Sequence, residues 1–185
     1  MKTKVLLSLL VTLLIFTPAF AKLISITSQN SASHIEYTLT CLQIPVKRKV
    51  LPVDAKLDLQ KANAVEGVSL HSIFLESKFT SVNPIFRRII NQEKYPGFVF
   101  SSTLHEPIVI KEKEPVEIDG NLTFHGVTKN IKINFENNSD GNNIDLIGNI
   151  NINMKDFGIH SPLLRLILID KVIKAKIELH GAIVN

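Results

Sequence analysis

The feature that most restricts the fold of this chain is an alternation of apolar and polar residues that recurs from residue 33 to the C-terminus. Around Leu122, for example, Ile118, Gly120 and Phe124 occupy alternate positions, and polar residues lie between them. Successive side chains of a β-strand point to opposite faces, so this pattern predicts a strand with one buried face. Strands are predicted in the same way at residues 34–41, 53–60, 68–73, 97–104, 117–124, 131–136, 144–153 and 173–183.

Short turn sequences separate several of these strands, as at His125-Gly126 and residues 138–141. Such connections favour antiparallel hairpins in a meander. Antiparallel strands with one apolar face can pack as a sandwich or close into a barrel, and closure removes the exposed edges of the sheet. A barrel of about eight strands is filled by its own side chains or holds a small ligand. The pattern alone leaves a ligand cavity and a filled core as equal alternatives.

Residues 83–96 break the alternation, because Phe86, Ile89 and Ile90 recur there at helical spacing. A proline lies near each end of this segment. Proline is common in the first turn of a helix and cannot continue one, so a short helix is predicted near residues 84–92. Its apolar stripe is expected to pack on the sheet.

The N-terminal 21 residues have the three parts of a secretion signal. Two lysines precede a short apolar run, residues 5–16, and Ala19 and Ala21 supply the two small side chains of a signal-peptidase site. A membrane-spanning helix needs about 20 apolar residues, and this run is shorter. Residues 1–21 are therefore predicted to be a cleaved signal peptide of a periplasmic or secreted protein. Residues 22–185 are predicted to form a single β-barrel domain.

Composition argues against several classes of function. Without the two lysines of the signal peptide, 19 basic residues remain against 17 acidic ones, a balance too slight to indicate nucleic-acid binding. Cys41 is the only cysteine, so no internal disulfide is expected. The six histidines form no His-x-x-x-His pair, and no Gly-x-Ser-x-Gly motif occurs. No metal site, no catalytic residue and no cofactor is therefore predicted.

Several motifs in the second half of the chain resemble one family. EKYPGFVFSS (93–102), GNLTFHGVTKNIKI (120–133), MKDFGIHSP (154–162) and the terminal LIDKVIKAKIELHG (168–181) are similar in order and spacing to the YceI-like, polyisoprenoid-binding family. The resemblance implies an extended antiparallel eight-stranded lipocalin-like β-barrel with a short helix near one end. It also implies a bacterial periplasmic or secreted protein that binds a long isoprenoid or similar lipid without catalysis or a metal, and it allows a homodimer.

If the barrel holds such a lipid, its inward apolar residues are the predicted lining. These residues are Phe98, Phe100, Leu122, Phe124, Ile133, Phe135, Leu146 and Ile150. An anionic or quinone head group would lie at the mouth of the barrel and need hydrogen-bond donors there. The positions of Arg87 and Arg88 in the predicted helix, and of Lys129 beside the predicted hairpin, make these three residues the predicted contacts of the head group.

Two other functions fit the same residues. A secreted structural or adhesion-type β-domain would show the same alternation, with a filled core and no bound lipid. A binder of fatty acids or fatty amides would have the same apolar lining as an isoprenoid carrier.

Overall fold

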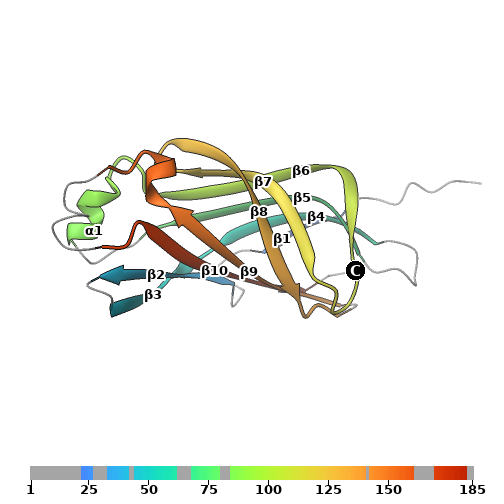
Figure 1. Cartoon of the computed structure of the whole chain (residues 1–185). Coiled ribbons are helices and arrows are strands. Elements are labelled where there is room, and N and C mark those ends of the chain that lie inside the picture. Colours follow the sequence, from blue (N-terminus) through green and yellow to red (C-terminus); the bar gives the residue numbers. More distant parts are fainter. Residues whose placement is uncertain are drawn as a thin grey trace, which may run out of the picture.

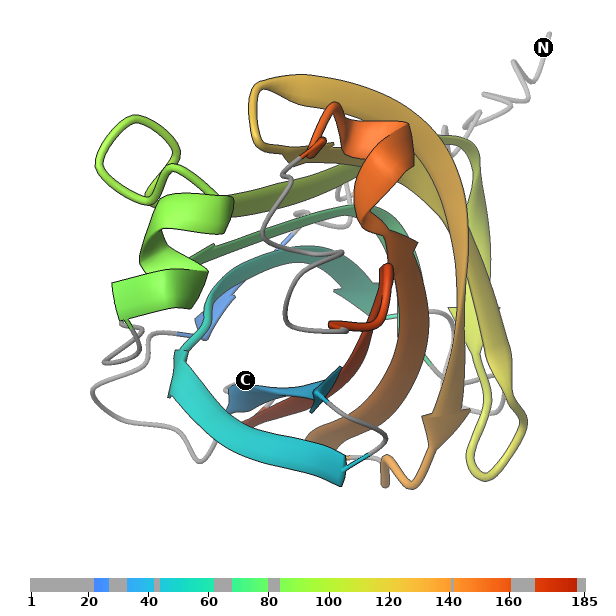
Figure 2. The same cartoon turned by 60° about the vertical axis from the view of Figure 1, so that its left-hand side comes forward.

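The computed structural model describes residues 22–26, 33–41, 44–61, 68–79, 84–140, 142–160 and 169–182. These residues form a ten-stranded antiparallel sheet that curls into an elongated barrel, with a short α-helix at one end (Figures 1 and 2). The predicted all-β, lipocalin-like architecture is confirmed. The predicted signal peptide lies outside the described residues.

The elements follow one another along the chain with short connections. They are β1 (Lys22–Ile26), β2 (His34–Cys41), β3 (Ile44–Pro52), β4 (Asp54–Lys61), β5 (Val68–Lys78), α1 (Pro84–Ile89), β6 (Gly97–Ile110), β7 (Val116–Phe124), β8 (Val127–Asn137), β9 (Asn143–Asn153), the 3-10 helix η1 (Met154–Phe157) and β10 (Val172–Ala182). In the sheet the strands take the order β1-β4-β5-β6-β7-β8-β9-β10-β2-β3. The predicted strands correspond to β2 and to β4 through β10, whereas β1 and β3 are additional.

β3 and β4 act as one bent strand, because only Val53 separates them. β3 pairs with β2, and β4 pairs with β5. The two strands therefore belong to opposite ends of the sheet although they are continuous in the chain, and β3 also contacts β5. The bend brings the ends of the sheet together. Counted as one strand, β3 and β4 give a barrel of eight strands from β2 to β10, and β1 adds a further strand beside β4.

The inward side chains of the strands form a hydrophobic core. In β7, burial alternates regularly: Ile118 and Leu122 are buried, and Asp119 and Asn121 between them are exposed. Apolar side chains on one face of each strand therefore meet in the interior, as the sequence pattern predicts.

Two inward positions are occupied by glycine, and each accommodates a phenylalanine ring from a neighbouring strand. A Cβ atom on Gly120 would lie 2.6 Å from the ring of Phe100, and one on Gly148 would lie 2.6 Å from the ring of Phe135. Any side chain at these positions would collide with the ring. The glycines therefore let both rings lie against the wall of the barrel.

Two local irregularities explain where the sequence pattern is imperfect. In β5, Leu70 and Ser72 face consecutive residues of β4, so that His71 forms a bulge and shifts the alternation. In α1, the helix ends at Ile89, earlier than predicted, because the backbone of Asn91 adopts a φ of 47°. That left-handed conformation cannot continue a right-handed helix.

The predicted turn between β7 and β8 is confirmed at His125 and Gly126. Their φ values are 52° and 75°, and two consecutive residues in the left-handed region are typical of a tight hairpin turn. A Cβ atom on Gly126 would also lie 2.7 Å from the ring of Tyr95. Glycine is therefore favoured here by its backbone freedom and by its size.

Candidate functional site

The predicted lining residues form one wall of the barrel interior. Phe98 and Phe100 come from β6, Leu122 and Phe124 from β7, Ile133 and Phe135 from β8, and Leu146 and Ile150 from β9. All of them are buried in the hydrophobic core. Phe100 and Phe135 are 0% exposed, whereas Ile150 is 8% exposed, so packing is tighter around the two rings. The structure thus brings the predicted lining together on four consecutive strands, and its contact with a ligand stays a prediction.

The end of the barrel beside α1 is filled by packed aromatic rings. Phe79, which follows β5, lies 6.2 Å from Tyr37 of β2, 6.0 Å from Phe98 of β6 and 5.6 Å from Phe124 of β7, measured between ring centroids. All four side chains are buried. Rings from three sides of the barrel therefore meet on Phe79.

Two short helices complete this packing. Phe86 of α1 stacks on Tyr37 with centroids 5.7 Å apart, and Phe157 of η1 lies 5.6 Å from Phe124. We refer to these six side chains (Tyr37, Phe79, Phe86, Phe98, Phe124 and Phe157) as the aromatic plug. Both helices lie at the same end of the barrel (Figures 1 and 2), and α1 owes its position to the burial of Phe86 and Ile89.

β8 and β9 separate from each other toward the aromatic plug. They are paired only from Asn134 opposite Asn149 to Asn137 opposite Leu146. Residues 127–133 of β8 pair with β7 alone among the described residues, and residues 150–153 of β9 pair with β10 alone. Figure 1 shows the two strands diverging toward η1, which lies between them. We refer to this unpaired region as the β8–β9 split.

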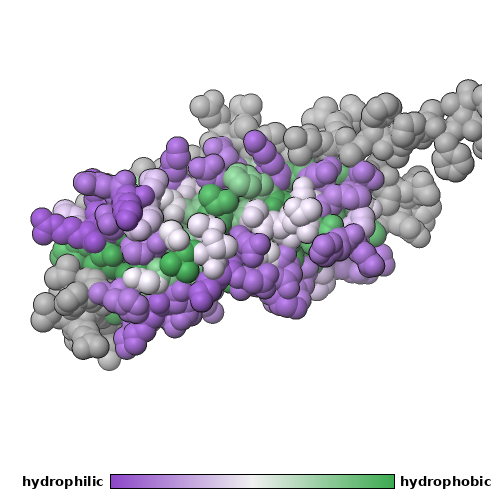
Figure 3. Space-filling view, turned by 90° about the horizontal axis from the view of Figure 1, so that it is seen from above, coloured by the Kyte–Doolittle hydropathy of each residue, from purple (hydrophilic) through white to green (hydrophobic). Residues whose placement is uncertain are grey.

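Side chains at the β8–β9 split are more exposed than those along the paired part of β8. Val127 and Ile131 occupy inward positions and are only partly buried, whereas Ile133 is fully buried. At the end of the split beside the β7–β8 turn, His125 Nδ1 lies 3.1 Å from the carbonyl oxygen of Phe157 in η1. From above, hydrophobic residues reach the surface among hydrophilic ones, including in the half of the barrel nearest α1 (Figure 3).

Lys129, a predicted head-group contact, lies on β8 in the β8–β9 split. It is directly opposite Leu122 of β7, and opposite residues of an antiparallel pair point to the same face. Leu122 is buried, but Lys129 is exposed. Lys129 therefore occupies an inward position in the sheet but is exposed to solvent.

Arg87 and Arg88, the other predicted head-group contacts, lie on the outer side of α1. Both are exposed, because Phe86 and Ile89 take the side of the helix that faces the barrel. The two arginines line a surface groove of about 480 Å³ together with Asn91 and Gln92. Among the described residues this groove is separate from the buried lining, so the structure does not join the arginines to it.

The opposite end of the barrel is held by buried polar side chains. Asn137 Nδ2 donates to the carbonyl oxygen of Lys111 at 2.6 Å, and Asn137 Oδ1 accepts from the backbone N–H of Ser139 at 2.9 Å. Ser139 Oγ accepts from the backbone N–H of Asp145, also at 2.9 Å. We call Asn137 and Ser139 the polar clamp, because they tie the β8–β9 connection to the β6–β7 connection.

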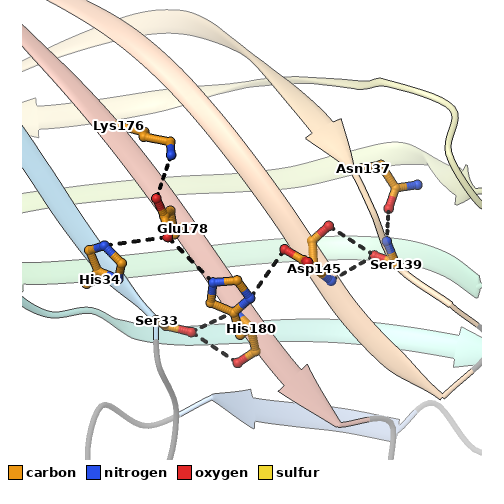
Figure 4. Close-up of polar contacts among 8 residues, drawn as sticks. All are labelled: Ser33, His34, Asn137, Ser139, Asp145, Lys176, Glu178 and His180. Atoms are coloured by element: carbon orange, nitrogen blue, oxygen red, sulfur yellow. Dashed lines mark hydrogen bonds and ion pairs between the residues drawn. The ribbon is translucent and has the colours of Figure 1, made fainter.

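A row of charged side chains covers the outer face where β2, β10 and β9 meet (Figure 4). Glu178 of β10 is its centre: Lys176 Nζ lies 2.6 Å from one carboxylate oxygen, and Nε2 of His34 and of His180 lie 3.5 Å and 3.7 Å from the other. The hydrogen bond from Lys176 holds the pKa of Glu178 below its ordinary value, although partial burial acts in the opposite direction.

His180 connects this row to the strands on both sides. Its Nδ1 lies 3.2 Å from Asp145 Oδ1 on β9. Ser33, which precedes β2, accepts from the backbone N–H of His180 at 2.8 Å and donates to its carbonyl oxygen at 3.0 Å. The sequence pattern places these residues on the polar face of their strands, but their contacts depend on strand pairing that the pattern does not contain.

Two kinds of feature are absent from the described residues. No group of three or more histidine, cysteine, aspartate or glutamate side chains in this part of the chain could hold a metal ion. No helix within it is long and apolar enough to cross a membrane.

Comparison with known proteins agrees with the observed barrel. A model of the YceI-like domain matches residues 27–184. A polyisoprenoid-binding domain from Saccharophagus degradans superposes with a TM-score of 0.57 at 12% identity, covering 88% of this chain and 99% of that one. BcnA from Burkholderia cenocepacia gives a TM-score of 0.57 at 11% identity, covering 80% and 96%.

A third solved structure, the YceI protein of Campylobacter jejuni, has a TM-score of 0.50 at 20% identity and covers 71% of this chain and 82% of its own. No curated protein matches the sequence. At these identities the similarity to solved structures establishes the fold.

Proposed function

The chain belongs to the YceI-like family, and we propose that it is a non-catalytic carrier of a long apolar lipid, such as a polyisoprenoid or an isoprenoid quinone. The observation that carries this proposal is the continuous apolar wall that β6, β7, β8 and β9 turn toward the barrel interior. The similar barrel from Saccharophagus degradans is a polyisoprenoid-binding domain, which supports a ligand of that class. No catalytic residue, metal ion or cofactor is part of the proposal.

Burial of the apolar chain would supply the binding free energy. Each square ångström of apolar surface removed from water contributes about 25 cal/mol. The proposed lining consists of phenylalanine, leucine and isoleucine side chains, which offer contact without a hydrogen bond. Such a lining suits an apolar chain and discriminates by length and width rather than by polar groups.

We propose that the polar head of the lipid stays at the α1 end of the barrel. Lys129 lies in the β8–β9 split at this end, and Arg87 and Arg88 line the groove on α1. A carboxylate, phosphate or quinone oxygen would accept charge-assisted hydrogen bonds from these side chains. The lysine can meet a head group at the wall of the barrel, whereas the arginines can meet one only outside it.

We also propose that the protein is exported to a bacterial periplasm or secreted, with residues 1–21 removed and residues 22–185 as the mature domain. The lysines and the short apolar run at the N-terminus support this proposal. Mass spectrometry of the exported protein would give its first residue, and its mass in solution would distinguish a monomer from a homodimer.

Lipid extraction is the direct test of the carrier function. Protein purified from its native envelope is expected to release an isoprenoid or another long-chain lipid that mass spectrometry identifies. Protein that releases no lipid, and that binds neither prenyl nor acyl probes, would contradict the proposal.

Substitution of Leu122 tests the lining itself. Leu122 is 1% exposed and lies in the centre of the apolar wall. Leu122→Arg is expected to abolish lipid binding and to lower stability, because it buries a charge without a partner. Leu122→Met, which nearly conserves volume, is expected to keep both properties. Lipid binding that survives in folded Leu122→Arg protein would remove Leu122 from the lining.

A structural or adhesion-type β-domain is the second candidate function, and one observation favours it. Phe100 and Phe135 are 0% exposed, so no space large enough for water adjoins them. Such a domain would yield no lipid on extraction and would keep its stability when lipid is removed from the medium.

A further inference from the structure

The aromatic plug obstructs the axial route into the barrel at the α1 end. Tyr37 of β2 and Phe124 of β7 lie on opposite sides of the barrel, because three strands separate β2 from β7 in either direction once β3 and β4 are counted as one. Phe79 bridges between them, with centroid distances of 6.2 Å and 5.6 Å. A long lipid that moved along the barrel axis here would have to displace these buried rings.

The β8–β9 split lies at the same end of the barrel as the plug, with η1 between its two strands (Figure 1). On the side that faces β8, residues Ile150 to Asn153 of β9 have no partner strand among the described residues. They form an edge about 13 Å long, at about 3.3 Å per residue. Ile150, Ile152 and, across the split, Ile131 all occupy inward positions; Ile131 is partly buried, and Ile150 and Ile152 are 8% and 6% exposed. The split therefore has apolar borders that adjoin the core.

We propose that the β8–β9 split is the portal through which a single-chain lipid passes into the barrel tail first, and that Lys129 holds its anionic head group outside. This inference rests on the proposed carrier function. It assigns a chemical class to the ligand: one apolar chain with a carboxylate or phosphate head.

The position of Lys129 supports this assignment. Between residues 127 and 135 of β8, all of which the structure describes, Lys129 is the only charged residue at an inward position. Its apolar stem can lie along the border of the split while the ammonium group stays in water. A lipid whose head contacts that ammonium group would direct its tail toward Leu122, the residue opposite Lys129.

A covalent bridge across the split tests the portal. If the register of β8 and β9 continued beyond Asn134, Asn130 would face Asn153, and both side chains are exposed. Asn130→Cys and Asn153→Cys are combined in a Cys41→Ser background and joined with a short bis-maleimide. Uptake of a fluorescent palmitate analogue, followed by stopped flow, is expected to slow about tenfold or more after bridging, because the barrier to passage rises.

The matched control places the same bridge on one side of the split. Thr123 Oγ1 and Thr128 Oγ1 lie 2.9 Å apart on the β7–β8 hairpin, so Thr123→Cys with Thr128→Cys accepts the reagent without spanning the split. Uptake by this variant is expected to stay unchanged. Equal slowing in both bridged proteins, or unchanged uptake in fully bridged Asn130→Cys/Asn153→Cys protein, would overturn the portal.

The two proposals fail in different ways. Unbridged protein that takes up no analogue and releases no lipid on extraction overturns the carrier function and the portal together. Uptake that is indifferent to the bridge overturns the portal alone.

Two single substitutions test the same route without a bridge. Ile131→Trp narrows the split and is expected to slow uptake, whereas Val109→Trp, at an exposed position of β6, is not.

Lys129→Gln is expected to weaken binding of the palmitate analogue about threefold to fivefold and to leave binding of its uncharged methyl ester unchanged. Lys132→Gln, on the outward face of β8, is the control, and an equal loss there would overturn the role of Lys129.

Discussion

The two ends of the barrel are held together by different kinds of contact. At the α1 end, the rings of the aromatic plug lie 5.6–6.2 Å apart. At the opposite end, the polar clamp makes hydrogen bonds of 2.6–2.9 Å. Packing of apolar rings sums many weak contacts, whereas a hydrogen bond is lost when its atoms move by about 1 Å. The α1 end is therefore held by summed contacts between rings, whereas the clamp end depends on a few hydrogen bonds between particular atoms.

Removal of one ring from the plug is expected to have the largest effect. Phe124 contacts Phe79 and Phe157 and is 1% exposed. Phe124→Ala is expected to lower the free energy of unfolding by about 3–5 kcal/mol, because it leaves a cavity among the rings. Urea denaturation measures this loss, and Asn130→Ala, at an exposed position, should stay within about 0.5 kcal/mol of the parent. A loss in Phe124→Ala as small as that of the control would show that the plug is loosely packed.

Removal of the polar clamp is expected to cost less overall and to act locally. Asn137→Ala deprives the carbonyl oxygen of Lys111 and the N–H of Ser139 of their partner. The free energy of unfolding is expected to fall by about 1–3 kcal/mol, and the amide of Ser139 should lose protection in hydrogen exchange. Asn138→Ala, at the exposed neighbouring position, should change neither quantity. An Asn137→Ala protein with full protection at Ser139 would contradict the clamp.

The smallest predicted effect is a dependence on pH near the clamp end. The folded pKa of Glu178 is held below its ordinary value of 4.5, mainly by the hydrogen bond from Lys176. Stability from this group is thus fully present above pH 4.5 and is lost as the pH falls through the lowered folded pKa.

Glu178→Gln should therefore be less stable than the parent at pH 7, by at most about 1 kcal/mol, and equally stable at a pH below the folded pKa. Urea denaturation at several pH values measures the difference, and Glu106→Gln, at an exposed position on β6, is the control. A stability difference that persists at low pH would show that charge is not its cause.

The direction of most side chains and the antiparallel pairing of consecutive strands could be predicted from the sequence, whereas the extent of each ladder could not. Leu122, Phe124, Ile133 and Phe135 are buried as their alternation predicts. The β8–β9 split depends on how far one ladder extends, and periodicity within a strand carries no information about its partner. Lys129 has the same parity as Ile131, so the alternation already places it on the inward face, although its exposure follows from the split.

Two strands, β1 and β3, could not be predicted from the alternation of apolar and polar residues. β3 lacks a regular alternation because Lys47, Arg48 and Lys49 interrupt it, and β1 is only five residues long. The predicted lining and head-group residues depend on information that the sequence does not contain. Sequence shows that a residue faces inward, but whether it meets a ligand or another side chain depends on the volume between the walls.

The bend at Val53 has a consequence for how such barrels can change during evolution. One residue joins the ladder that β3 makes with β2 to the ladder that β4 makes with β5. Because side chains alternate with period two, an insertion of one residue that no bulge absorbed would turn Ala55, Leu57 and Leu59 from the core to solvent. An insertion of two residues would preserve every face. An added residue at this joint is therefore compatible with the core only if residues are added in pairs or if a β-bulge absorbs the odd one, as the register shift opposite His34 and Ile35 already does in β3.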